Sequence, residues 1–282
     1  MADTQSVIYA QAYGQNIMQL AQQKYSKLIN TVYMKPNVRG KTFFQDQIGK
    51  WAMSTKGGRN VATPNNDPEL ARRMGIMLDY HDARMVDRGD ELKSISDPKS
   101  AYTIAAAQAL GRKIDDVIIA AAIGSAYSGE TGSTTVTNGN TKLVTNNVLT
   151  LAEVLSIKQT LDEADVDDEE RYFVTDPTTL ASLLNLSQAT SADYVTVRAL
   201  VNGDIDTWMG FKWIKSTRIS AVTTCSGIVF QKYGLCLAMA AQPMVRTDER
   251  TDLSYSWQIY YELNVGAVRL EEDRCINVIS AS

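Results

Sequence analysis

The chain has 282 residues, 44% of them hydrophobic, which is enough to bury one large core or two moderate ones. No secretion signal opens it and no run of about 18 apolar residues occurs, so we expect neither secretion nor membrane insertion. The net charge of −4 is mild, and the three cysteines form no CxxC pair, which excludes a zinc ribbon or a redox motif.

Charge is unevenly distributed along the chain. Residues 1–93 hold 13 Lys and Arg against 9 Asp and Glu, whereas residues 94–282 hold 15 against 23. Either this is ordinary scatter over solvated faces, or the basic part lies on an acidic neighbour. The second interpretation favours self-association.

An amphipathic helix is predicted for residues 6–30. Ile17, Leu20 and Leu28 follow the three-four spacing of a helix, with polar residues between them. Because the apolar stripe is narrow, the helix is expected to dock either on the body of its own chain or on a neighbouring subunit.

A long two-stranded ribbon is predicted for residues 35–93. Two extended runs, KTFFQDQIGKWAMS and ARRMGIMLDYHDARMVD, flank the polar stretch TKGGRNVATPNNDPEL. The second run alternates between an apolar face and a mixed face, which are Met74, Ile76, Leu78 and Tyr80 against Arg73, Gly75, Met77 and Asp79. An isolated ribbon is marginal in water. We therefore expect it either to fold back on its own domain or to bury Phe43, Trp51 and Met74 on another subunit.

A long helix is predicted next, with Asp97 as its N-cap and Pro98 at its first position. It is expected to run to about Ala126 and to stop near Gly129, which at about 1.5 Å per residue makes a rod of about 43 Å. The dipeptide Asn138–Gly139 then predicts a type I′ hairpin turn between strands rich in Thr and Val.

The second half of the chain mixes helix and strand. A helix at about 151–164 precedes a strand, RYFVT, which ends at Asp176 and Pro177, and the short helix TLASLLNL follows. From Gly210 onward most segments have the composition of strands separated by Gly, Pro and charged turns. These elements indicate an α+β protein with antiparallel sheet.

No arrangement of catalytic residues stands out. His81 is the single histidine and lies in a predicted strand, so a Ser-His-Asp system or a His-based metal site lacks its partners. The acidic run 162–170 fits a solvated loop better than a magnesium site or an acid-base pair. The stretch KGGR, from Lys56 to Arg59, likewise fits a flexible basic turn better than an anion site. Because recognised phosphate-binding and calcium-binding motifs are missing, we expect no cofactor.

The order of the predicted elements resembles the major capsid protein family of tailed phages, the Hong Kong 97-like fold, which encapsulin nanocompartments share. Further likeness lies in GRKIDDVIIAAAIGSAYSG, RYFVTDPTTLASLL and DYVTVRALVNGDIDTWMGFKWIKSTRI, and in the closing strands from Gly227 to Ile279. The resemblance covers nearly the whole chain.

This resemblance implies five parts: an N-terminal arm (1–34), an extended-loop β-hairpin (35–93), a long spine helix with the first part of the peripheral domain (94–164), an axial domain (165–231) and the returning strands of the peripheral domain (232–282). It also implies a loop near the capsomer axis, formed by Asn202, Gly203 and Asp204. The extended loop is expected to contact the next subunit through Phe43, Trp51, Lys56, Gly57, Gly58, Arg59, Arg72, Arg73 and Met74.

The implied function is that of a major capsid protein without enzymatic activity, which self-assembles into hexamers and pentamers of an icosahedral head. The expected partners are further copies of the chain, a separate scaffolding protein, a portal, and double-stranded DNA held by weak non-specific contact. Assembly is expected in the host cytoplasm, and the final location is the virion capsid. Two alternatives stay open: an encapsulin-like shell around cargo protein, and a carboxylate- or metal-dependent enzyme that uses the acidic run. A lysine–asparagine cross-link, known in some members, is not carried over, because no motif identifies its Asn and Glu.

Overall fold

The structure of the protein is a computed structural model, which describes residues 22–63, 67–87, 98–145, 149–184, 207–219 and 225–281. By their contacts these residues fall into two compact units. The smaller unit holds residues 22–26, 79–87, 98–112 and 242–263, and the larger unit holds the rest. No described helix is both long and apolar enough to cross a membrane.

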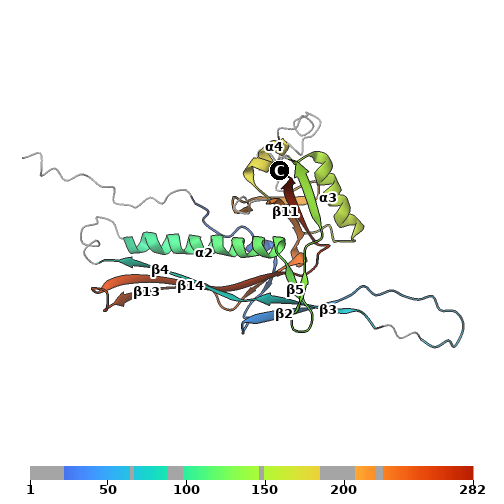
Figure 1. Cartoon of the computed structure of the whole chain (residues 1–282), viewed down its shortest axis with the longest axis horizontal. Coiled ribbons are helices and arrows are strands. Elements are labelled where there is room, and N and C mark those ends of the chain that lie inside the picture. The colour runs from blue at the N-terminus through green and yellow to red at the C-terminus, as the bar shows by residue number, and fades with distance from the viewer. Residues whose placement is uncertain are drawn as a thin grey trace, which may run out of the picture. The chain divides into compact units, whose positions relative to one another are not determined.

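The smaller unit combines the start of a long helix, α2 (Pro98–Ile123), with strands. These strands are β4 (Leu78–Val86), β13 (Met244–Arg250) and the first half of β14 (Ser256–Arg269). Both β4 and β13 pair with β14, and Figure 1 draws α2 alongside β4 and β14. The prediction that Pro98 opens the helix is confirmed, since a first-turn residue needs no N–H. The expected cap, Asp97, lies outside the described residues.

A six-stranded sheet in the larger unit has the strand order β7-β15-β11-β8-β10-β9. Its strands are β7 (Thr141–Thr145), β8 (Arg171–Thr175), β9 (Thr207–Trp208), β10 (Phe211–Lys215), β11 (Cys225–Gln231) and β15 (Cys275–Ala281). Figure 1 shows α3 (Leu151–Glu163) and α4 (Pro177–Leu184) in the same lobe. Their inner faces share one core with the sheet, which includes Ile157, Leu161, Leu183, Phe173, Phe211 and Trp213.

Local sequence explains where these two helices begin. Thr150 caps α3, because its hydroxyl accepts from the N–H of Glu153, whose carboxylate accepts from the N–H of Thr150 at 2.7 Å in return. Pro177 opens α4, and the carboxylate of Asp176 accepts from the N–H of Thr178. The predicted helix, strand and short helix of this region are therefore confirmed.

The larger unit contains further strand pairs. A four-stranded antiparallel sheet has the order β2-β3-β5-β6, with strands β2 (Thr42–Ile48), β3 (Leu70–Ile76), β5 (Ala126–Ser128) and β6 (Thr134–Val136). Two other strands, each preceded by a short 3₁₀ helix, are β1 (Tyr33–Lys35) and β12 (Leu235–Met239). β1 runs parallel to β12, which pairs antiparallel with the second half of β14. Since β7 with β15 and β8 with β10 are also parallel, the other two sheets are mixed, and the prediction of antiparallel sheet is wrong for them.

The predicted hairpin turn at Asn138–Gly139 is wrong. The strand before it, β6, pairs with β5, and the strand after it, β7, pairs with β15, so the two belong to different sheets. The actual hairpin turn joins β5 to β6, where Gly129 (φ 95°) and Gly132 (φ 72°) supply left-handed backbone. Asn138 is buried instead, and its side-chain amide donates to the carbonyl of Ala122 at 3.4 Å. Long-range pairing has overridden a local turn preference.

The helix predicted to reach Ala126 ends earlier, at Ile123. The carbonyls of Ala122 and Gly124, at its end, accept hydrogen bonds of 3.0 and 2.6 Å from the guanidinium of Arg269. The chain then enters β5 directly. A buried cation therefore satisfies carbonyls that another helical turn would have used.

The helix predicted for residues 6–30 is absent from residues 22–28, and the part up to residue 21 lies outside the described residues. Asp115, fully buried on α2, accepts hydrogen bonds from the backbone N–H groups of Lys27 and Leu28 at 3.1 and 3.2 Å. These N–H groups are therefore held by a side chain instead of by helix carbonyls.

Candidate functional site

The ribbon predicted from the sequence is present but shorter. β2 and β3 pair antiparallel along their whole length, and one further bond, from the N–H of Gly49 to the carbonyl of Glu69 at 2.7 Å, extends the ladder. The described residues between them, 50–63 and 67–69, belong to no helix or strand, and Figure 1 shows an open loop beyond the two strands. After Met77 the chain leaves the ribbon and enters β4, which pairs with β14.

Large apolar side chains are exposed along this loop and at the strand ends that carry it. We call them the loop surface, and they are Ile48, Trp51, Met53, Val61 and Leu70. Trp51 is 75% exposed, and Met53 is fully exposed. Apolar residues scattered singly are normal on a surface, whereas several of them on one projecting segment make that segment a candidate interaction site. Sequence reasoning found only Trp51, because polar neighbours separate the other four and no period joins them.

Basic side chains lie on the same loop as the loop surface. Lys50, Lys56 and Arg59 are all exposed, and the backbone bends at Arg59 and Asn60, where Asn60 has a φ of 60°. Gly57 has no atom within 4 Å of the place where a side chain would begin, and Gly58 is exposed as well. The stretch from Lys56 to Arg59 is thus an open basic bend, as the sequence predicted.

Two residues predicted to contact a neighbour are buried within their own chain. Phe43, 4% exposed, shares a core with Met77, and its ring occupies the space beside Gly75 where a Cβ would lie 2.2 Å away. Arg73, 8% exposed, forms an ion pair of 2.6 Å with Glu272. Within β3 and Met77 the predicted faces are therefore reversed: Arg73, Gly75 and Met77 of the mixed face are buried, and Ile76 on the apolar face is exposed. The ring of Phe43 fits against Gly75 because glycine has no side chain, and counting apolar residues on each face of the strand does not reveal this fit.

The two other predicted contact residues of β3 keep part of their surface. Arg72 donates from Nε to Asp46 Oδ1 at 2.5 Å, and this hydrogen bond lowers the pKa of the Asp46 carboxyl. The guanidinium of Arg72 lies 5.5 Å from the ring centroid of Phe44. Met74 is half-buried over Gly132. Both side chains belong to the ribbon and are only partly buried.

The acidic run 162–170 is organised by cations. The guanidinium of Arg171 is almost fully buried and lies 2.6 Å from Asp162 and 3.1 Å from Asp168. Glu170 pairs with Lys232 at 2.7 Å. Across the described ranges, no group of three or more His, Cys, Asp or Glu side chains is placed to hold a metal ion. The geometry of this run is that of a folded, ion-paired loop.

Other candidate nucleophiles and bases have packing roles. Burial raises the pKa of the Cys225 and Cys236 thiols to about 11 and that of Cys275 to about 12, so all three stay protonated at neutral pH. His81 lies beside Tyr260, with ring centroids 6.4 Å apart. The predicted axis loop, Asn202 to Asp204, lies outside the described residues.

The family and structure comparisons agree over nearly the whole chain. A family model described as phage capsid protein matches residues 6–280. No curated protein matches. Among solved structures, the capsid of cyanophage P-SCSP1u has a TM-score of 0.78 at 16% identity, covering 98% of this chain and 94% of that chain.

Two further structures are similar at low identity. That of Mycobacterium phage Che8 has a TM-score of 0.72 at 14% identity, covering 96% of this chain and 97% of that chain. The capsid of Ralstonia phage GP4 has a TM-score of 0.73 at 9% identity, covering 98% and 96%. At such identities the likeness establishes the fold, and it extends over nearly all of the chain.

Proposed function

The chain belongs to the phage capsid protein family and has the Hong Kong 97-like capsid fold, and on this premise we propose that its copies assemble into the hexamers and pentamers of an icosahedral head enclosing double-stranded DNA. As a member of a structural family it is a shell subunit, and we assign it no catalytic role. Its place is the virion capsid, after assembly in the host cytoplasm.

The loop surface is the observation that carries this proposal. Its side chains are left uncovered by the residues that the structure describes, and a neighbouring copy would bury them. At about 25 cal/mol per Å², burying about 400 Å² of apolar surface per loop contributes about 10 kcal/mol before ordering costs. Because each subunit both gives and receives a loop, the contact is heterologous and closes into rings.

The charges support the same contact. The exposed cations Lys56 and Arg59 lie on the loop, whereas Lys50 lies 3.9 Å from Asp165 of its own chain. The part of the chain beyond residue 93 is acidic. Within the run 162–170 the outward-facing Asp167 and Glu169 offer one acidic surface for a neighbour's loop. Such exposed pairs orient the encounter more than they strengthen it.

We assign the lobe of the six-stranded sheet to the axial domain. It is larger than the range 165–231 expected from the sequence, because β7, α3 and β15 share its core. The peripheral domain would then contain α2, β4, β13 and β14. A separate scaffolding protein and a portal are the proposed assembly partners, and the packaged DNA would be held without sequence preference.

Deleting the loop tests the proposal. Removing residues 55–68 leaves five residues between Gly49 and Glu69, which is enough to close the β2–β3 hairpin. We expect a folded, soluble subunit that forms no closed shells, measured by circular dichroism, size-exclusion chromatography and electron microscopy. The matched control is Leu155→Ser, which removes an exposed apolar side chain from α3 and should assemble normally. Closed particles of normal diameter from the deletion variant would refute the role of the loop.

The contents of particles formed by the original chain distinguish a phage head from a cargo-filled compartment. Nuclease-protected double-stranded DNA in particles purified from cells is the result expected for a head. Particles filled only with a second protein would contradict it.

A further inference from the structure

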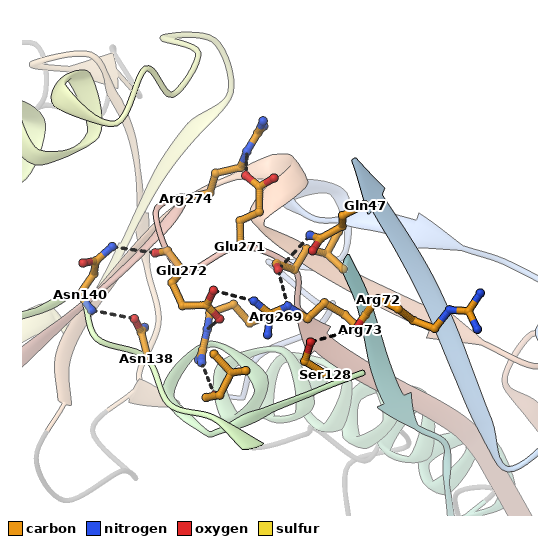
Figure 2. Close-up of polar contacts among 12 residues, drawn as sticks. Gln47, Arg72, Arg73, Ser128, Asn138, Asn140, Arg269, Glu271, Glu272 and Arg274 are labelled. Carbon is orange, nitrogen blue, oxygen red and sulfur yellow. Dashed lines mark hydrogen bonds and ion pairs between the residues drawn. The ribbon is translucent and has the colours of Figure 1, made fainter. Parts of the chain in front are cut away.

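The connection between β14 and β15 joins several elements of the larger unit (Figure 2). Arg269, at its start, is completely buried. Its guanidinium donates to the carbonyls of Ala122 and Gly124 at the end of α2, and to the carbonyl of Val136 in β6 at 3.1 Å. One side chain therefore ties the long helix to the edge of the four-stranded sheet.

Both strands of the ribbon are held at this same connection. Gln47 of β2 donates from Nε2 to the carbonyl of Leu270 at 2.9 Å, and Arg73 of β3 donates from Nε to that carbonyl at 2.9 Å. Arg73 also donates from Nη2 to Glu272 Oε2 at 2.6 Å. Figure 2 shows Gln47 and Arg73 converging on the connection from the two strands. The half of the ribbon next to the loop is thus fixed by three hydrogen bonds that involve no ladder pairing.

Glu272 lies between two buried arginines. Its Oε2 binds Arg73, and its Oε1 lies 3.6 Å from Nε of Arg269. Its backbone carbonyl accepts from the side-chain amide of Asn140 at 2.9 Å, so its own position is fixed. A carboxylate that accepts a charge-assisted bond from a guanidinium imposes direction as well as energy.

A second ion pair on the ribbon provides the contrast. Arg72 and Asp46, on the same two strands, have side chains that are 42% and 69% exposed, against 10% and 25% for Arg73 and Glu272. An exposed pair contributes little to position because water competes for both partners. Of these two ion pairs, the one between Arg73 and Glu272 joins the ribbon to the β14–β15 connection, whereas that between Arg72 and Asp46 stays within the ribbon.

We propose that Glu272, acting through Arg73, is a positioning residue for shell assembly that sets the direction in which the ribbon presents its loop to the next subunit. The inference rests on the proposed function. At about 3.3 Å per extended residue, the bend at Arg59 lies up to about 33 Å from Gly49, so a rotation of about 10° at the base displaces it by about 6 Å. Around a closed ring each contact repeats the same error, so a misdirected loop prevents closure or changes the size of the shell.

The test compares shells assembled from Glu272→Gln and Arg73→Lys subunits with those from Asp46→Asn, the exposed-pair control. Arg73→Lys keeps the charge, but its single ammonium cannot reproduce the fork that reaches both Leu270 and Glu272. Assembly is run at a temperature where circular dichroism shows each subunit fully folded, so that stability does not decide the outcome. We expect roughly half or more of the assembled material from both variants to be open sheets or particles of wrong diameter. The Asp46→Asn control should match the original chain.

Gln47→Leu keeps the inference testable if Glu272→Gln fails to fold. It removes one hydrogen bond to Leu270 without leaving a charge unpaired, so the subunit should remain folded, with a smaller shell defect of the same kind. Shells of normal closure and diameter from the folded Arg73→Lys and Gln47→Leu subunits would overturn the inference.

The two proposals fail separately. If deletion of residues 55–68 abolishes closed shells while the Arg73 and Gln47 variants assemble normally, only the positioning role of Glu272 falls. If the deletion variant itself forms normal shells, the assembly role of the loop falls, and the inference falls with it.

Discussion

Individual polar side chains in the smaller unit are held by partners far away in the sequence. The hydroxyl of Tyr261 on β14 donates to Asp82 Oδ2 on β4 at 2.5 Å. This hydrogen bond lowers the pKa of the Asp82 carboxyl, while burial, followed by the contact with Asp82, raises the pKa of the Tyr261 hydroxyl. The pair therefore joins two strands in a way that depends on pH at both extremes.

The Tyr261→Phe variant should reveal this dependence. Because the pKa of Asp82 is lowered on folding, its stabilisation is complete above the ordinary value of 3.8 and is lost as pH falls through the folded value. Because the pKa of Tyr261 is raised, its contribution is complete below 10 and is lost as pH rises further. We expect the variant to lose about 1 kcal/mol of unfolding free energy at pH 7. In urea titrations the difference from the original chain should shrink near pH 3, and a constant difference at all pH values would contradict the account.

Buried charge is what the sequence could not predict at individual positions. Arg73, Arg171 and Arg269 have the composition of surface residues, yet each is enclosed by carbonyls and carboxylates. Their partners lie in other elements or in loops whose backbone turns toward them. Only the three-dimensional arrangement supplies enough acceptors to offset the cost of burial.

Among the elements, those with strong local signals were predicted correctly. The helix predicted at about 151–164, the strand before Asp176 and the Pro98 start of α2 all agree with the structure. Short strands were not predicted: β1 was placed inside the N-terminal arm, and β13 was missed because its residues alternate weakly and are mostly exposed. The Asn138–Gly139 turn was wrong because strand pairing across more than a hundred residues outweighs a turn propensity.

The packing of Phe43 against Gly75 leads to a prediction about stability. Gly75→Ala would put a Cβ 2.2 Å from the ring of Phe43, so either the ring or the strand must move. Overpacking of this kind costs about 2 kcal/mol, and we expect a corresponding fall in the melting temperature. Gly57→Ala is the matched control, since nothing lies within 4 Å of the new methyl group and the melting temperature should hardly change. Equal melting temperatures for the two variants would mean that Phe43 does not pack on Gly75.

For the complete molecule, element order was enough to predict the fold, while the residues that form the proposed contact surface were predicted only in part. The basic bend from Lys56 to Arg59 and Trp51 lie on the loop as expected, but Phe43 and Arg73 serve their own chain. A pattern of alternating residues cannot tell an apolar face that packs inside from one kept for a partner. In β3 the buried face is the one that packs on Phe43 and pairs with Glu272, and these contacts exist only in the folded chain.

The most direct test of the central claim is an electron cryo-microscopy map of assembled particles, inspected at the loop between β2 and β3. The account predicts that Trp51 and Met53 are covered by a neighbouring subunit, and that the bend at Arg59 lies near acidic side chains of that neighbour. A map in which the loop folds back on its own subunit, or projects uncovered into solvent, would contradict it.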